Sequence, residues 1–294
     1  MPELPDITVY VEALEARVVG QPLTNVQITT PFLLRTVDPS LQHVAGQVVR
    51  AVTRLGKRIV FALDDDLYIV MHLMIAGRLH WIDAGKRVPK TALALFEFPN
   101  GTLTLTEAGS KKRASLHIVR GAEALKQFER GGIEPLECTT EEFARRLRGE
   151  NHTVKRSLTD PRLFSGIGNA YSDEILHRAR MSPVKLTSRL TDDEIARLHD
   201  ATRAVLVEWV ERMRSQANGA FPEKVTAFRP EMAVHGRFGQ PCPVCGTAVQ
   251  RIRYADNETN YCPRCQTDGK LLADRALSRL LKQDWPRTIE QLEG

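Results

Sequence analysis

Four cysteines near the end of the sequence have the spacing of a metal site. Cys242 and Cys245 form one pair, Cys262 and Cys265 form another, and sixteen residues separate the two pairs. Four thiolates at this spacing close a tetrahedron around Zn²⁺ and leave no position open for catalysis. The fifth cysteine, Cys138, stands alone, so a disulfide framework is not indicated. We therefore predict one structural Zn²⁺.

A glycine-rich turn is the second place where chemistry is expected. Gly166-Ile167-Gly168 runs into a predicted helix, and such a turn presents backbone N–H groups to an anion. Asn169 adds a side-chain amide, and Lys155 lies fourteen residues earlier. The third glycine of a dinucleotide-binding fingerprint is missing and the surroundings are helical. A phosphate site and a plain interhelical turn both remain open on these residues alone.

The charge of the chain points to a polyanionic partner. Its formal net charge is +5, and basic residues cluster at Lys111-Lys112-Arg113, at 145–148, and at Arg251 with Arg253. A solvated surface explains any single cluster equally well. We find no run of about 18 apolar residues and no signal pattern at the start. A cytoplasmic, nucleoid-associated protein with no membrane partner is expected.

Two kinds of periodicity organise the chain that carries these residues. Apolar residues at helical spacing (Ile7, Val11, Leu14, Val18) predict a helix over 3–19. Alternating patterns then predict strands at 58–63, 67–75, 92–98 and 102–107, joined by short polar turns. The region from about 20 to 120 is therefore expected to be a β-sandwich or a barrel.

The second half of the chain has helical patterns. Helices are expected at 169–181, at 191–215 with Thr191 as N-cap, and after an N-cap at Thr140. A loop at 217–241 leads to the cysteines, whose intervening segment is typical of a β-hairpin. An apolar stripe marks the tail 270–285, formed by Leu272, Ala276, Leu277, Leu280 and Leu281. We expect it to pack on the protein's own helices, with a partner-binding helix as the alternative.

Together these features resemble the formamidopyrimidine-DNA glycosylase and endonuclease VIII family. The matching segments are Pro2-Glu3-Leu4-Pro5, Gly56-Lys57, "HLMIAG" at 72–77, Lys155, Gly166-Ile167-Gly168-Asn169 and the four-cysteine finger. The resemblance implies an α+β chain made of an N-terminal helix with an antiparallel catalytic β-sandwich (1–122), a helix-two-turn-helix DNA-binding domain (123–235), a zinc finger (236–270) and a helical tail (271–294). The implied partner is damaged double-stranded DNA, bound by a monomer.

The resemblance also implies roles for individual residues. Once Met1 is removed, the secondary amine of Pro2 would attack C1′ of a flipped-out damaged nucleotide and form a Schiff base. An α-amino group has an ordinary pKa of roughly 8, so a neutral fraction exists at pH 7. Glu3 would act as general acid and base, and Lys57 would assist β-elimination. Lys155 and Asn169 would hold the phosphate backbone. The implied function is base-excision repair by a DNA glycosylase with AP lyase activity.

Three departures from the family pattern affect what can be carried over. Asn257 stands where the family's finger has a phosphate-binding arginine, and Arg251 or Arg253 is the nearest substitute. The segment "TEAGSKKRASL" keeps basic charge but lacks the family's aromatic wedge, and Ile75 replaces an inserted methionine. The loop at 217–235 is also shorter than the one that closes over 8-oxoguanine. A pocket for 8-oxoguanine is therefore not predicted.

Two other functions compete with the enzyme at this point. The missing finger arginine and wedge suit a non-catalytic protein that binds bent or damaged DNA. A zinc-ribbon protein that binds RNA or a protein partner would explain the cysteines, but it would leave the N-terminal Pro-Glu and Lys57 as coincidences.

Overall fold

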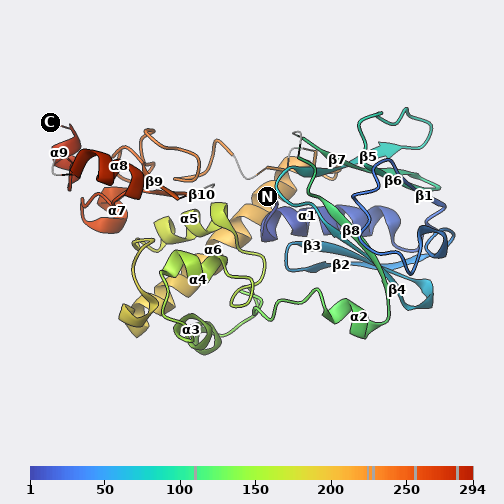
Figure 1. Cartoon of the computed structure of the whole chain (residues 1–294), viewed down its shortest axis with the longest axis horizontal. Coiled ribbons are helices and arrows are strands. Elements are labelled where there is room, and N and C mark those ends of the chain that lie inside the picture. Colours follow the sequence, from blue (N-terminus) through green and yellow to red (C-terminus); the bar gives the residue numbers. More distant parts are fainter. Residues whose placement is uncertain (109–110, 224, 227–228, 255–256, 283–284, 294) are drawn as a thin grey trace. The chain divides into compact units, whose positions relative to one another are not determined.

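The computed structural model describes residues 1–293 except 109–110, 224, 227–228, 255–256 and 283–284. Its contacts divide the chain into unit 1, made of 1–130 and 208–226, and unit 2, made of 131–207 and 227–294. Figure 1 labels the elements and colours them by their position in the sequence. Within the described residues, no helix is both long enough and apolar enough to span a membrane.

Unit 1 contains two four-stranded antiparallel sheets. In the order of their pairing, one consists of β1 (Asn25–Ile28), β6 (Ala94–Phe98), β7 (Gly101–Glu107) and β5 (Gly77–Asp83), and the other of β2 (Val49–Leu55), β3 (Arg58–Leu63), β4 (Leu67–His72) and β8 (Ser115–Arg120). Side chains of both sheets share one core, in which Phe61 stacks on Phe96 with 6.4 Å between ring centroids. The sandwich is confirmed, and the alternative of a barrel is excluded.

Strand β3 shows why this sequence forms a buried strand. Ile59, Phe61 and Leu63 point into the core between the sheets, whereas Val60 packs on the opposite face with Phe128. Alternate residues of a strand face opposite sides, and both sides are apolar here because both are covered. Removal of a buried ring such as that of Phe61 typically costs ~3–5 kcal/mol.

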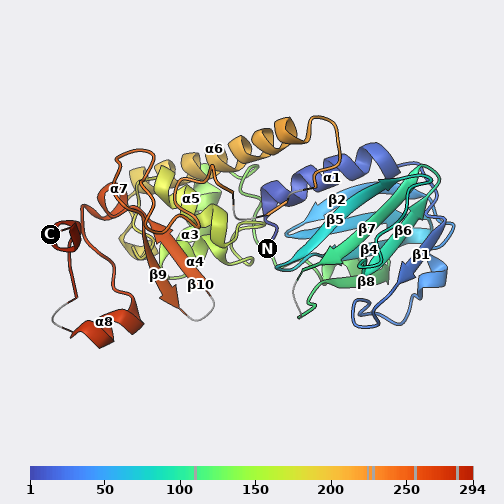
Figure 2. The ribbon, with the colours of Figure 1, turned by 90° about the horizontal axis from the view of Figure 1, so that it is seen from above.

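Helix α1 (Leu4–Val18) packs against β2 and β3 in unit 1 (Figure 2). Its buried stripe includes the predicted Ile7, Leu14 and Val18. Tyr10 from the same helix accepts a hydrogen bond from the backbone N–H of Leu79 at 3.3 Å. The start of the chain is thus fixed to the sandwich by both apolar packing and a buried hydrogen bond.

The strand predicted over 67–75 is shorter in the structure. Strand β4 ends at His72, and residues 73–76 form a turn in which Met74 has a φ of +52°. Gly77 closes this turn, because a Cβ there would lie 2.3 Å from the carbonyl oxygen of Leu73. Ile75 occupies the tip and is 55% exposed. Leu73 stays in the core, whereas Met74 and Ile75 lie in the turn, so the apolar run of 73–75 leads into a turn instead of continuing the strand.

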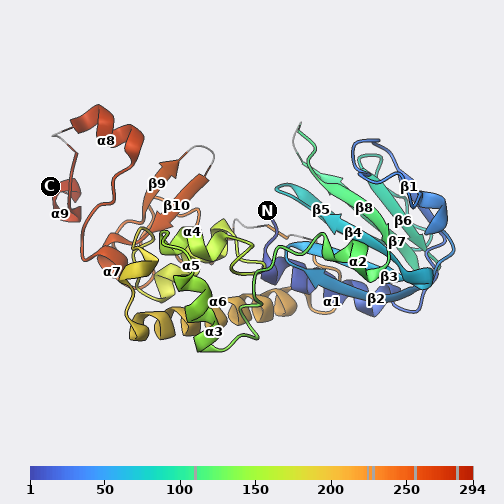
Figure 3. The ribbon, with the colours of Figure 1, turned by 60° about the horizontal axis from the view of Figure 1, so that its bottom comes forward.

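Unit 2 combines helices with the predicted hairpin. Its elements are α3 (Thr140–Arg148), α4 (Val154–Thr159), α5 (Asn169–Arg178), β9 (Gln250–Tyr254), β10 (Asn257–Tyr261), α7 (Pro263–Thr267), α8 (Arg275–Leu281) and α9 (Ile289–Glu293). Strands β9 and β10 pair antiparallel, and β10 lies against α5 (Figure 3). Helix α6 (Asp192–Ala217) gives its first part to unit 2 and its last part to unit 1, and α2 (Ala122–Lys126) belongs to unit 1.

The two predicted helix caps have different outcomes. Thr191 caps α6 as predicted: its hydroxyl accepts from the N–H of Glu194 at 3.2 Å, and its own N–H donates to that glutamate at 3.1 Å. The cap of α3 is Thr139 instead of Thr140, because Thr139 makes the same reciprocal pair with Glu142. Either threonine satisfies the sequence pattern, and the spacing to Glu142 decides between them.

The tail contradicts the prediction that its whole apolar stripe packs on the protein. Leu280 is 77% exposed and Leu281 is 39% exposed. The side chains of Ala276 and Leu277 lie outside the described residues, and Leu272 is partly buried. The amphipathic pattern thus marked an apolar face correctly, but the end of that face stands in solvent.

Candidate functional site

The first residues of the chain are held rigidly at the start of α1. Glu3 is the N-cap residue, and its backbone N–H donates to Oδ2 of Asp6 at 2.9 Å. Both carboxylate side chains are buried, and so is Pro2. A capping carboxylate in the first turn is also favoured by the helix dipole. The predicted Pro2 and Glu3 therefore sit in a fixed and largely desolvated place.

Lys57 is positioned by the tight turn of the β2–β3 hairpin. Leu55 pairs with Arg58, so only Gly56 and Lys57 form the turn, and Gly56 has a φ of +60° that glycine adopts without strain. Burial lowers the pKa of Lys57, whereas the nearby charges of Glu3 and Asp6 raise it. The ammonium therefore shares one electrostatic environment with the two carboxylates of α1.

The terminal amine joins the same group. Burial lowers the pKa of the Met1 α-amino group, Glu3 and Asp6 raise it, and Arg78 and Lys57 lower it. The net direction is downward, so a larger fraction of this amine is neutral at pH 7 than for an exposed chain end. The structure thus brings together the predicted N-terminus, Glu3 and Lys57. It adds Asp6 and Arg78, which sequence reasoning missed.

A cluster of cationic and imidazole groups adjoins this site, and sequence reasoning also missed it. His72 of β4 pairs with Arg58 of β3. Arg58 directly follows Lys57 in the chain. Burial, followed by the charges of Arg58, Lys57 and Arg130, lowers the pKa of His72 to about 4. His72 is therefore neutral at pH 7. The pairing of the two adjacent predicted strands was the one signal that could have placed His72 beside Lys57.

The predicted basic residues Lys111, Lys112 and Arg113 lie on an exposed loop that follows β7. Glu107, at the end of β7, holds this loop: its carboxylate accepts from the N–H of Arg113 at 2.9 Å and from that of Ala114 at 3.1 Å. The ammonium of Lys112 donates to the carbonyl of Glu107. Glu107 therefore fixes the backbone at the end of the loop that carries these three basic residues.

In unit 2, Lys155 and Asn169 meet at the beginning of α5. The ammonium of Lys155 donates to Asp173 and, at 3.3 Å, to the backbone carbonyl of Asn169. The side-chain amide of Asn169 donates to the carbonyl of Glu258 at 2.8 Å. The structure brings the two residues together as expected, and it also gives each an intramolecular partner. Their contact with a phosphate stays a prediction.

The hairpin arginines share a single carboxylate. Arg251 approaches Oε2 of Glu258 at 3.4 Å, and Arg253 donates to the same oxygen at 3.1 Å. The Arg251 guanidinium also lies 4.1 Å from the ring centroid of Phe238. Asn257, at the start of β10, is exposed and carries no charge. The positive charge of this hairpin therefore comes from β9 and not from position 257.

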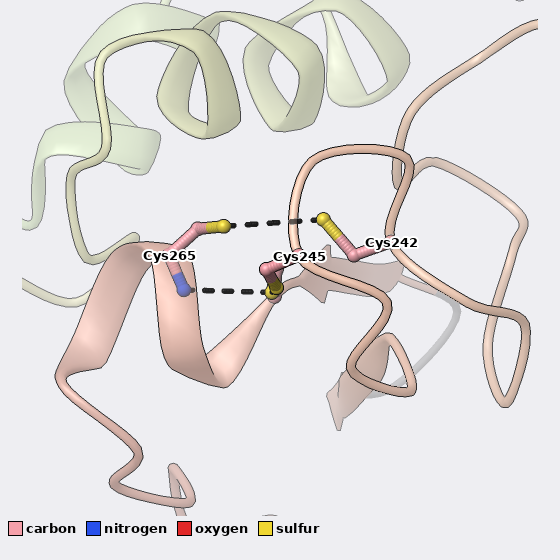
Figure 4. A group of neighbouring side chains, drawn as sticks. Cys242, Cys245 and Cys265 are labelled. Atoms are coloured by element: carbon pink, nitrogen blue, oxygen red, sulfur yellow. Dashed lines mark hydrogen bonds between the residues drawn. The ribbon is translucent and has the colours of Figure 1, made fainter.

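The four cysteines of the finger converge. Their sulfur atoms all lie within 4.8 Å of one another, and Cys242 faces Cys265 with 3.9 Å between the sulfurs (Figure 4). This donor set fits Zn²⁺, because four thiolates at these separations make a closed tetrahedral site. His177 of α5 adds a contact of 3.2 Å from Nε2 to the sulfur of Cys242. The finger binds one structural zinc ion, as the spacing predicted.

Comparison with known proteins identifies the domains of the chain. Residues 1–113 match the family model of the formamidopyrimidine-DNA glycosylase N-terminal domain, 132–219 match its H2TH domain, and 239–267 match the zinc finger found in FPG and IleRS. The formamidopyrimidine-DNA glycosylase of Symbiobacterium thermophilum is 33% identical over 286 residues, which cover 94% of this chain and 93% of the relative.

The chain belongs to the formamidopyrimidine-DNA glycosylase family. Solved structures of the family agree. A complex of the Lactococcus lactis Fpg with DNA containing an abasic site has a TM-score of 0.80 and 26% identity, and covers 90% of this chain and 99% of that one. A complex of the Lactococcus lactis FPG (MutM) with DNA containing FAPY-dG has a TM-score of 0.80 and 27% identity, and covers 90% of this chain and all of that one. Family membership confirms the resemblance seen in the sequence.

Proposed function

We propose that the chain is a DNA glycosylase of base-excision repair that also cleaves the strand as an AP lyase. The observation that carries the proposal is the grouping of a buried chain end, Glu3 and Lys57 in unit 1. Membership of the formamidopyrimidine-DNA glycosylase family supports it, and so do relatives bound to abasic and FAPY-dG DNA. A non-catalytic paralogue is not favoured, because such a protein has no need of these groups.

The nucleophile in this proposal is the secondary amine of Pro2. It forms when Met1 is removed, which a small next residue such as proline permits. Burial disfavours the charged form of an amine at this place, as the lowered pKa of the Met1 amino group shows. A neutral amine keeps the electron pair needed for attack, so the desolvated site supports nucleophilic catalysis near pH 7.

The proposed reaction displaces the base, opens the sugar, cleaves the strand and then releases the enzyme. The Pro2 nitrogen bonds to C1′ as the C1′–N bond of the damaged base breaks, and the base leaves with that electron pair and takes up the proton that the Pro2 nitrogen releases. Protonation of O4′ by Glu3 opens the sugar and gives an iminium ion on Pro2. Loss of a proton from C2′ then expels the 3′ phosphate, with Lys57 assisting the proton transfer. Water finally hydrolyses the iminium and frees Pro2.

The basic residues of both units are proposed to bind the DNA backbone. Lys111, Lys112 and Arg113 in unit 1 and Lys155, Asn169, Arg251 and Arg253 in unit 2 supply the donors, and Asn257 offers an amide. Such contacts give affinity without reading sequence. We also propose that the protein acts in the cytoplasm and as a monomer. Sedimentation of the protein with a duplex would measure the stoichiometry of the complex.

Borohydride trapping tests the catalytic proposal. The wild type is incubated with a duplex containing one abasic site and reduced, and a covalent adduct is expected on denaturing gels. Pro2→Gly should reduce trapping and Glu3→Gln should abolish base release from a damaged duplex. Glu15→Gln is the matched control, because Glu15 is an exposed glutamate on the same helix.

Two outcomes would refute the enzyme. The first is no adduct from wild type under conditions that trap a known member of the family. The second is an intact mass that retains Met1, since an acylated Pro2 nitrogen cannot form the iminium. Tight binding of the abasic duplex without any trapping would instead support the non-catalytic DNA-binding paralogue.

A further inference from the structure

A fully buried carboxylate lies in unit 2, outside the group formed by Pro2, Glu3 and Lys57. Asp173 is 0% exposed and accepts from donors on three other segments. Lys155 of α4 donates to Oδ1, while Nδ1 of His235 at 2.8 Å and the backbone N–H of Asn260 at 3.2 Å reach Oδ2. A carboxylate only accepts hydrogen bonds, so Nδ1 of His235 carries the proton in this contact.

The carboxylate of Asp173 fixes the position of the Lys155 ammonium. An ammonium group has three donors, and Asp173 and the carbonyl of Asn169 take two of them. With two donors fixed, the direction of the third is fixed as well. Asn169 is the first residue of α5, so the ammonium lies where this helix begins, and the helix dipole favours an anion there. Lys155 is therefore an oriented donor, not a mobile point charge.

The neighbouring residue, Glu174, has a purely structural role. Glu174 accepts from the backbone N–H groups of Ala233, Val234 and His235 at 2.7, 2.9 and 2.9 Å. Those bonds tie the segment before the finger to α5. Asp173, one residue earlier, also anchors structure through Nδ1 of His235 and the N–H of Asn260, but in addition it binds the ammonium of Lys155. The two carboxylates are both buried on one helix but differ in what they hold, so they form a matched pair for experiment.

Keeping an ionised carboxylate buried is expensive unless its partners are well placed. Loss of one partner of such a pair leaves an uncompensated charge, whereas apolar replacement of both is often tolerated. The bonds from His235 and Asn260 account for the carboxylate of Asp173, but they do not account for Lys155 as its third partner. The pairing is explained if Lys155 must keep one orientation for a ligand.

We propose that Asp173 is a positioning residue for DNA binding, which acts by orienting the ammonium of Lys155 toward a backbone phosphate. The inference rests on the proposed binding of DNA, but not on the chemistry at Pro2. Its test is a double-mutant cycle on the full-length zinc-loaded protein. The dissociation constant for a duplex with a tetrahydrofuran abasic analogue is measured by fluorescence anisotropy at several salt concentrations.

The cycle uses Asp173→Asn, Lys155→Met and the double variant. Each single change should weaken binding about 10-fold and reduce the magnitude of the salt slope by about one, the amount expected for one lost phosphate contact. The double variant should bind no worse than Lys155→Met alone. Glu174→Gln is the control: it should lower the melting temperature while the salt slope stays at the wild-type value.

Lys155→Arg provides a second arm that does not disturb the buried carboxylate. It keeps the charge but changes the geometry, so binding should weaken while the salt slope is retained. Wild-type affinity in Lys155→Arg would overturn the proposal, because a point charge would then suffice. Additive losses in the double variant would overturn it too, as would tighter binding by Asp173→Asn.

Melting temperature and zinc content are recorded for every variant, which separates lost positioning from lost folding. If the wild type itself fails to bind the duplex, the proposed function fails. If the wild type binds and Asp173→Asn matches it, only the positioning role fails.

Discussion

The side-chain amide of Asn169 donates to the backbone carbonyl of Glu258 at 2.8 Å, so the first residue of α5 is tied to the second residue of β10. The same Glu258 holds Arg251 and Arg253 through its carboxylate. One residue of the hairpin therefore connects the start of a helix with two guanidinium groups. All three donors belong to residues proposed to bind DNA.

Asn169→Ala should weaken binding of an abasic-analogue duplex ~10-fold, because it removes one amide donor and leaves the Glu258 carbonyl without it. Asn169→Asp should be worse, since a carboxylate cannot donate and repels phosphate. Anisotropy titrations check both. Equal affinities for Asn169→Asp and the wild type would contradict the prediction.

Lys57→Met should raise the melting temperature at pH 7 while it lowers borohydride trapping. The folded chain lowers the pKa of Lys57, so between that lowered value and the ordinary value near 10.5 the unfolded chain binds more protons. Stability rises with pH across this window, and below it the fold bears the full cost of burying the ammonium. The gain from Lys57→Met should shrink as the pH approaches the ordinary value.

Thermal melts at pH 7 and pH 10 measure this gain. Lys126→Met is the control, because Lys126 forms an exposed pair with Glu123 whose loss changes stability little. A destabilised Lys57→Met at pH 7 would show that attraction to Glu3 and Asp6 outweighs burial.

Acid should destabilise unit 1 through His72. Its pKa is about 4 in the fold against an ordinary 6.5, so between these values the unfolded chain binds more protons and stability falls as the pH drops. From pH 7.5 to pH 5 the loss is roughly 2 kcal/mol. Urea unfolding of His72→Gln should lack this part of the pH dependence, whereas the exposed His43→Gln should retain it. Parallel curves for wild type and His72→Gln would refute the assignment.

Removal of zinc should weaken DNA binding and lower the melting temperature. The four thiolates close the finger, and a structural zinc site contributes directly to folding. Cys245→Ser should lose metal in elemental analysis and bind the duplex at least ~10-fold more weakly. Cys138→Ser should keep its zinc, because Cys138 lies outside the finger. Undiminished affinity after chelation would show that the finger is dispensable for binding.

Glu107→Ala should loosen the basic loop after β7. It leaves the N–H groups of Arg113 and Ala114 without their acceptor, at a cost of ~1–3 kcal/mol. Duplex affinity should drop several-fold, and the drop should be smaller at high salt because the loop acts by charge. The exposed Glu129→Ala is the control. A salt-independent loss would assign Glu107 a role in folding alone.

The sequence predicted best where local spacing determines the structure. The cysteine pairs, the hairpin between them, strand β3 and the stripe of α1 all depend on residues close together in the chain. Lys57 was found through the family pattern, and its turn is local as well. The end of the stripe at Leu280 was predicted wrongly, because periodicity shows an apolar face but not what covers it.

The partners of the site residues could not be predicted, because they are distant in sequence. His235 meets Asp173 across 62 positions, and Glu258 meets Asn169 across 89. Asp6 approaches Lys57, and Arg78 approaches the terminal amine, only after α1, the β2–β3 hairpin and β5 pack together. Charged residues at such separations show no periodicity in the sequence. Their pairing becomes apparent only when the fold buries them together.

The adjacent carboxylates Asp173 and Glu174 also restrict how this segment can evolve. Neighbouring residues of an α-helix point about 100° apart, so each carboxylate reaches its own set of donors only in the present frame. Deletion or insertion of a single residue between Asn169 and Asp173 would rotate both away at once. Length variation among descendants of this chain should therefore collect in the loops and spare the first turn of α5.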